Sequence, residues 1–259
     1  MKEEIKKFIY SKKSIVVWAL IVLIMIFESV SLYLITLGEK SNYYYLDVAF
    51  LSGKSEGHIP QMIIFWFLPI ILLLLFGDKV LSEIENGTSN IYIVKKSKKK
   101  YINDKVMVGF LIGFGVVFLS LIINLIISFL LFKDNNIDIE FIESIKGIKG
   151  LEYSLWQFEN PLTSYLIYII IASWFSGILS SFVILLGTLI KDKKIVMASS
   201  FFIWFLLVSR GSKSVMNIFQ PFNEFSLNEQ ISIFIESNIY VFVIILIIKI
   251  ILKKRNDYV

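Results

Sequence analysis

Long apolar runs alternate with polar segments along the whole chain. Several of these runs approach or exceed the about 20 residues that a helix needs to cross the ~30 Å hydrocarbon core of a bilayer. The fifth run is short, so we expect its outer end to bend or turn back before it reaches the far surface. The pattern predicts an all-α membrane protein, a six-transmembrane-helix bundle that forms one domain over residues 1–259. The expected spans are residues 15–35, 61–76, 106–132, 164–190, 195–208 and 238–252.

The basic residues between the runs predict the orientation of the bundle. Loops on the cytoplasmic side of a membrane carry an excess of lysine and arginine. Segments 2–13, 77–105, 191–194 and 253–255 hold 18 of the 26 basic residues, whereas the opposite set of segments holds seven. We therefore expect both chain ends in the cytoplasm of the cell.

Two of the connecting segments carry further expectations. Segment 1–13 has Ile5, Phe8 and Ile9 at helical spacing among lysines, which predicts a short interfacial helix. A solvated positive tail is the alternative. Segment 133–163 is expected to form an external loop.

Composition excludes several kinds of site. Hydrophobic residues make up 56% of the chain, and there is no cysteine, which excludes disulfides, thiolate catalysis and cysteine-based metal sites. The single histidine, His58, excludes a histidine-rich metal site and has no evident partner in the sequence. Gly53-Lys54-Ser55 resembles the end of a phosphate-binding loop, but Val48 stands where that loop needs its first glycine. We expect no catalytic, cofactor or metal site in this chain and no nucleic-acid partner.

A few polar or small residues inside the expected spans are candidates for a translocation path. A carboxylate within the membrane is costly and is by default a functional hypothesis, which makes Glu28 a candidate for lining such a path or contacting another helix. The alternative is that Glu28 lies close enough to the outer interface to reach headgroups and water. Ser173, Ser176 and Ser180 of the fourth span are further candidates. Small residues also let helices pack closely, so packing within the bundle is the alternative for the serines.

The segment 77–105 combines features that a simple charged loop does not need. The helix of the second span is expected to continue beyond Phe76, and Gly87 is well placed to end it. Ser97 is a candidate cap for the helix that leads into the third span. Five lysines between residues 95 and 100 would suit a membrane-facing surface, but the apolar residues 91–94 beside them would not. We interpret this elbow as a docking surface for a cytoplasmic protein.

The elbow carries a family resemblance. Glu83-x-Glu85-x-Gly87-Thr88, followed by an amphipathic stretch, a serine with basic neighbours and Lys105 at the next span, resembles the membrane subunits of type-2 ABC exporters (ABC-2 permeases). Lys95-Lys96-Ser97-Lys98 departs from the usual Pro-x-Ser-Arg of that family. The resemblance implies that the elbow is the coupling helix that docks on an ATPase. The residues it assigns to coupling are Glu83, Glu85, Gly87, Thr88, Ile91, Tyr92, Tyr101 and Lys105.

The resemblance also implies partners and a substrate class. The chain would be a permease without its own nucleotide site, working with cytoplasmic ABC ATPase subunits that bind ATP and Mg²⁺. A second permease, identical or different, would complete the complex in a bacterial cell membrane. The expected substrate is a peptide such as an antimicrobial, toxin or signalling peptide; drugs, lipid-linked molecules and ions are alternatives. Residues 217–230, with Pro221, would supply a re-entrant element before the last span. A non-transporting immunity or sensor protein is the alternative function.

Overall fold

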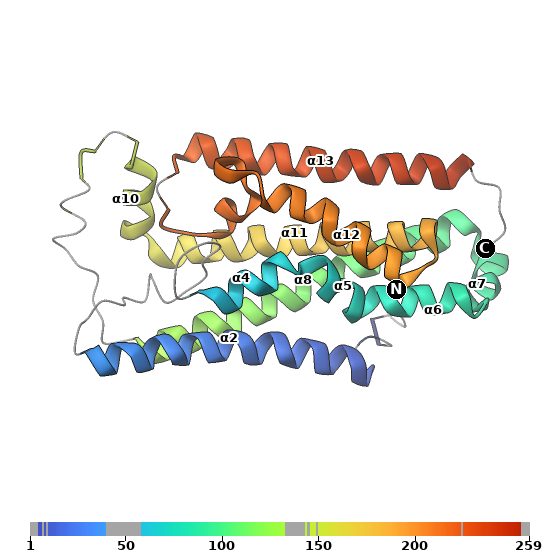
Figure 1. Cartoon of the computed structure of the whole chain (residues 1–259), viewed down its shortest axis with the longest axis horizontal. Coiled ribbons are helices and arrows are strands. Elements are labelled where there is room, and N and C mark those ends of the chain that lie inside the picture. Colours follow the sequence, from blue (N-terminus) through green and yellow to red (C-terminus); the bar gives the residue numbers. More distant parts are fainter. Residues whose placement is uncertain are drawn as a thin grey trace.

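The computed structural model of the chain describes residues 10–39, 58–132, 150–223 and 225–254, with isolated positions at 5, 6, 8, 143 and 146–148. Every regular element in these residues is a helix, and the long helices lie side by side along one axis (Figure 1). The long helices are α2 (Lys12–Glu39), α8 (Lys98–Leu131), α11 (Pro161–Ile190) and α13 (Leu227–Lys254).

Shorter helices connect or flank these four. They include α4 (Ile59–Trp66), α5 (Leu68–Leu72), α10 (Glu152–Glu159) and the 3₁₀ turns η2 (Gly211–Lys213) and η3 (Val215–Phe219). The remaining elements are the π-helical turn η1 (Leu73–Gly77), α6 (Asp78–Glu85), α7 (Thr88–Lys96) and α12 (Lys193–Val208).

Long helices cover four of the six predicted spans. The four long helices are each long and apolar enough to cross a membrane, and α4 and α5–α6 together make a bent fifth candidate. The chain is therefore compatible with a multi-pass membrane protein. α13 begins at Leu227, about three turns before the predicted start of the last span, because its polar first turns are also helical.

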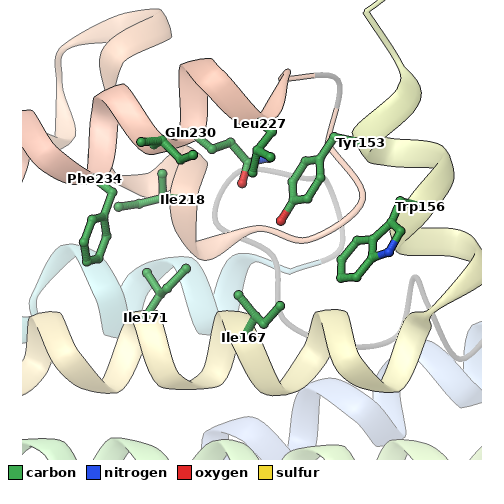
Figure 2. Close-up of a pocket in the computed structure, with 9 residues that line it drawn as sticks. Tyr153, Trp156, Ile167, Ile171, Ile218, Leu227, Gln230 and Phe234 are labelled. Carbon is green, nitrogen blue, oxygen red and sulfur yellow. The ribbon is translucent and has the colours of Figure 1, made fainter.

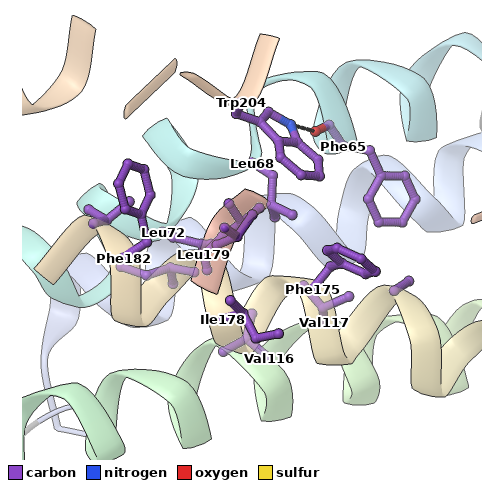
Figure 3. Close-up of a cluster of buried hydrophobic side chains, with 14 of the residues drawn as sticks. Phe65, Leu68, Leu72, Val116, Val117, Phe175, Ile178, Leu179, Phe182 and Trp204 are labelled. Atoms are coloured by element: carbon purple, nitrogen blue, oxygen red, sulfur yellow. Dashed lines mark hydrogen bonds between the residues drawn. The ribbon is translucent and has the colours of Figure 1, made fainter. Parts of the chain in front are cut away.

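The second predicted span, residues 61–76, is not one straight helix. The axis bends by 66° between Ile59–Trp66 and Leu68–Glu85. Pro69 lies immediately after this bend and has no backbone N–H to donate to the carbonyl of Phe65 four residues earlier. The indole Nε1 of Trp204 donates to that carbonyl at 2.8 Å instead, as Figure 3 shows. The fold therefore stabilises the bend, because Trp204 of α12 supplies the hydrogen bond that Pro69 cannot give to the Phe65 carbonyl.

The fifth predicted span is also shorter than a full crossing. α12 has 16 residues, which corresponds to about 24 Å of helix against the ~30 Å of a hydrocarbon core. After it, the chain turns back through η2 and η3, and all five residues of η3 are buried. A buried turn thus precedes the last long helix, at residues 215–219 rather than across the predicted 217–230.

α11 runs through the middle of the bundle. Its most apolar stretch is 83% buried, whereas the corresponding stretches of α2 and α13 are each 28% buried. Buried side chains from α4, α5, α8 and α12 pack around α11, as the cluster in Figure 3 shows. α11 is the core helix, and α2 and α13 present wide apolar surfaces outward.

The predicted cytoplasmic segments gather at one end of the bundle. The first turn of α2, the α6–α7 elbow and the last turn of α13 all lie at this end (Figure 1). The carboxylate of Asp78 pairs there with Lys13 of α2 and Lys193 of α12. Three of the basic segments that the charge pattern assigned to one side are thus joined in space.

Some predictions concern residues outside the described ranges. Of the predicted interfacial helix 1–13, Ile5 and Phe8 are helical and pack against the core, while residues 1–4, 7 and 9 lie outside. The phosphate-loop-like residues 53–55 lie outside as well. In the predicted loop 133–163, the first ten residues lie outside, and residues 152–159 form α10.

Candidate functional site

The elbow is built from α6, α7 and the start of α8, joined by two tight breaks. α6 ends at Glu85, and Gly87 follows with a φ of 69°, a left-handed conformation that glycine adopts at little cost. The predicted helix end at Gly87 is confirmed. Ser97, the second break, has a φ of 73° and makes no capping bond with its side chain, so the predicted Ser97 cap is wrong. The backbone conformation of Ser97, without a bond from its side chain, sets the break between α7 and α8.

A buried ion pair closes the elbow onto the bundle. The Nζ of Lys105 lies 2.6 Å from Oε2 of Glu83, and the exposed fractions of the two side chains are 4% and 13%. The hydroxyl of Tyr101 donates to the same oxygen at 3.3 Å. At such low exposure an unpaired charge would be expensive, so each partner depends on the other. The pair joins the end of α6 to α8.

Two tyrosine rings cover this ion pair. The rings of Tyr92 and Tyr101 stack with centroids 6.3 Å apart. The Lys105 ammonium lies 5.5 Å from the Tyr101 centroid and 5.9 Å from the Tyr92 centroid, within the range of a cation–π interaction. Tyr92 belongs to α7, so this contact fastens α7 to the same point. The hydroxyl of Thr88 adds a bond to the Glu83 carbonyl at 3.1 Å.

The other predicted coupling residues lie on the outer side of the elbow. Glu85 is exposed, and the Ile91 side chain is 60% exposed. Val94, one turn further along α7, is 88% exposed. The structure therefore divides the predicted set in two. Glu83, Tyr92, Tyr101 and Lys105 come together inside the elbow, whereas Glu85, Thr88 and Ile91 are exposed, as are Val94 and Lys95.

Asp78 is a site residue that the sequence did not reveal. It stands just after the π-helical turn, and its pairing with Lys13 and Lys193 connects α6 to α2 and α12. The hydroxyl of Ser14 donates to the Leu75 carbonyl within that turn at 2.8 Å. π-Helical turns are frequent at functional sites. The partners of Asp78 come from distant parts of the chain, so local spacing carries no signal for them.

Glu28 lies near the opposite end of the bundle and is fully buried. One carboxylate oxygen is 2.5 Å from Nδ1 of His58, and the other accepts the backbone N–H of Gln61 at 2.8 Å. The expectation that His58 lacks a partner is therefore wrong. Glu28 holds the N-terminal turn of α4, where a negative charge is favoured. A contact with another helix was one expected role of Glu28; its role in a path stays a prediction.

The three candidate serines lie on α11, and two of them face α8. Ser176 Oγ donates to the Gly113 carbonyl at 2.8 Å, and Ser173 Oγ donates within its own helix to Ile169 at 2.7 Å. A Cβ at Gly113 would stand 2.7 Å from Cβ of Ser180, so the two helices meet closely at this point. The serines contribute to packing within the bundle, and their role in lining a path stays a prediction.

Comparison with known proteins finds a relative in Bacillus subtilis. The chain is 36% identical over 249 residues to YybM of Bacillus subtilis (strain 168), described as an uncharacterized protein. The match covers 95% of each chain. No family model and no solved structure matches the chain.

Proposed function

The chain belongs to the same family as Bacillus subtilis YybM, and we propose that it is the membrane-spanning permease subunit of an ATP-driven exporter of the ABC-2 type. The observation that carries the proposal is the elbow. A short helix stands out at the end of the bundle where the basic segments gather, and its inner side is fixed by the Glu83–Lys105 pair. Its outer side presents apolar residues that no part of the described chain covers.

The outer side of α7 has the chemistry of a docking surface. Ile91 and Val94 are among the most exposed large apolar side chains of the described residues. Lys95, next to Val94 in the chain, and Glu85, at the end of α6, are exposed as well. An apolar centre with a charged rim is typical of protein interfaces. The proposed partner is a cytoplasmic ABC ATPase that receives α7 in a groove.

In this proposal six helical passes form the permease. The bent unit α4–α6 is the second pass, the short α12 with the buried turn η3 is the fifth, and the four long helices are the others. The bias of basic residues supports a cytoplasmic location for the elbow and both chain ends. The second pass continues directly into the elbow through α6. A force on α7 would therefore reach the membrane part through a continuous helix and the Glu83–Lys105 pair.

The remaining parts of the proposed complex are separate molecules. ATP and Mg²⁺ bind to the ATPase, a second permease pairs with this one, and the complex works in a bacterial cell membrane. The proposed cargo is a peptide. The support for this class is the family resemblance of the elbow alone.

The proposal is tested by purifying the chain from its native cells in a mild detergent with an affinity tag. We expect a co-purifying protein that carries a Walker phosphate-binding motif, together with ATP hydrolysis by the eluate. The same purification of a Val94→Asp variant should lose both, because a buried apolar contact would become an unpaired charge. An eluate of the intact protein that contains no such ATPase contradicts the proposal and favours a non-transporting membrane protein.

A further inference from the structure

A cleft of about 560 Å³ lies between the first halves of α11 and α13, at the end of the bundle opposite the elbow. Ile167 and Ile171 of α11 form one wall, and Leu227 of α13 lies on the other (Figure 2). Ile231 of α13 also lines the cleft. Trp156 of α10 stands at its outer rim. We call it the α11–α13 cleft.

The inner end of the cleft is closed where the two helices meet. The indole Nε1 of Trp174 on α11 donates to Oδ1 of Asn238 on α13 at 3.0 Å. Nearby, the rings of Phe175 and Phe234 pack edge to face with centroids 5.8 Å apart. The lining residues of α13 run from Leu227 to Phe234, which corresponds to about 10 Å of helix. That length is less than half of a ~30 Å hydrocarbon core, so the cleft fits within one leaflet.

The walls of the cleft are mostly apolar, and the polar groups among the lining residues besides Gln230 are the Tyr153 hydroxyl and the Trp156 indole N–H at the rim. Gln230 is the one amide that lines it. Its Oε1 accepts the hydroxyl of Tyr168 at 2.5 Å, and its Nε2 donates to Oδ1 of Asn223 at 2.9 Å. The amide is thus already engaged on both sides. A ligand that fits these walls is a hydrocarbon.

The cleft is accessible from the side. Leu227 and Ile231 are 45% and 46% exposed, although they belong to a helix apolar enough to span a membrane. At the rim, the rings of Tyr153 and Trp156 stack with centroids 5.8 Å apart. Tyrosine and tryptophan prefer the level of the lipid headgroups. α10 therefore marks the membrane surface, and the cleft extends from it toward the bilayer centre.

We propose that the α11–α13 cleft binds one acyl chain of a phospholipid in the leaflet at this end of the bundle. A peptide would bring backbone N–H and C=O groups that need hydrogen-bond partners in apolar surroundings. The amide of Gln230 cannot serve as such a partner, because both of its ends are already hydrogen-bonded. The proposal does not depend on the exporter function.

The test uses the full chain reconstituted in vesicles of phosphatidylcholine and phosphatidylglycerol. A small fraction of the phosphatidylcholine carries a diazirine in the middle of one acyl chain. After illumination, mass spectrometry of the peptides should show several-fold more adducts on residues 167–171 and 227–234 than on the exposed residues Leu20, Leu23 and Phe27 of α2. Equal labelling of these segments would contradict the proposal, because it would reflect ordinary contact with bulk lipid.

Two variants separate the cleft from the surrounding surface. Ile171→Trp fills the cleft and should reduce the labelling of 227–234 to the level of α2, whereas Leu23→Trp, on the exposed side of α2, should leave it unchanged. Ile231→Phe repeats the test if Ile171→Trp does not give a monodisperse protein. Labelling that persists in the filled variants overturns the proposal. Labelling by a diazirine-bearing apolar peptide in place of the lipid does so too.

Discussion

The ammonium of Lys105 lies 2.6 Å from the carboxylate of Glu83, beneath two tyrosine rings, where the elbow returns to the bundle. The two residues are 22 positions apart in the chain, and the pair turns α6, α7 and α8 into one unit. Because α6 continues from the bent second pass, a movement of α7 would be transmitted through α6 to that pass. This arrangement gives a physical reason for a glutamate and a lysine at these positions, other than direct contact with a partner.

Removing one member of this pair should loosen the elbow. Glu83→Gln leaves the Lys105 charge buried without a counter-charge, a change that typically costs about 3–5 kcal/mol. We expect trypsin to cut the lysine-rich stretch 95–100 faster in this variant than in the native protein. Lys105→Met in addition should restore part of the resistance, because the unpaired charge is gone. Glu85→Gln is the matched control and should have no effect, since Glu85 is exposed; a similar loss in both variants would contradict the role of the pair.

The conformation at Gly87 predicts which side chains are tolerated there. A φ of 69° costs a residue with a Cβ roughly 1–2 kcal/mol, and more for a β-branched side chain. Gly87→Val should therefore disturb the elbow and its proposed ATPase contact, measured by trypsin sensitivity and co-purification. Asparagine adopts this conformation more readily, so Gly87→Asn should stay close to native. A Cβ at Gly87 would have room, since the nearest atom outside its chain neighbours would be 3.9 Å away. Equal damage by both variants would therefore refute the explanation from backbone conformation.

Close packing of α8 on α11 predicts a sharp difference between two glycines of the same helix. A Cβ at Gly113 would lie 2.7 Å from the Ser176 carbonyl oxygen, whereas a Cβ at Gly115 would meet nothing within 4 Å. Gly113→Ala should destabilise the bundle by about 1–3 kcal/mol through overpacking. Gly115→Ala should be neutral or slightly stabilising. The melting temperature of the purified protein in detergent checks both, and an equal response at the two sites would show that the helices do not meet as described.

The bend in the second pass predicts an interaction between two distant substitutions. Trp204→Phe removes the indole N–H and leaves the Phe65 carbonyl without its partner, at a cost of about 1–3 kcal/mol. Pro69→Ala supplies a backbone N–H that can bond the same carbonyl. The loss of melting temperature caused by Trp204→Phe should therefore be smaller in the Pro69→Ala background. Losses that simply add would mean that Trp204 stabilises the bundle by packing alone.

Much of the helical architecture could be predicted because the length of an apolar run and the position of a helix break depend on residues that are neighbours in the chain. Four spans, the continuation of the second pass beyond Phe76 and the helix end at Gly87 follow from such local signals. The 66° bend was not predicted, although Pro69 was visible, because proline at a first helical turn and proline in a helix interior look alike in sequence. Its stabilisation by Trp204 depends on a contact between residues 139 positions apart in the chain.

The candidate site shows the same division. The motif residues of the elbow could be chosen from their spacing, but not sorted into an inner and an outer set, since exposure depends on how α7 folds back on α8. Asp78 was missed because its partners Lys13 and Lys193 are near only in space. His58 was set aside for the same reason: its partner Glu28 belongs to another helix.

The most direct test of the exporter account is a cross-link from Val94, the most exposed apolar residue of the elbow. A photoreactive phenylalanine analogue at position 94, expressed in the native cells, should give a single adduct with a cytoplasmic protein that mass spectrometry identifies by its Walker motif. The same analogue at Leu23, on the exposed side of α2, should not give that adduct. Failure of position 94 to reach any such ATPase, in cells where the protein is correctly inserted, would contradict the account.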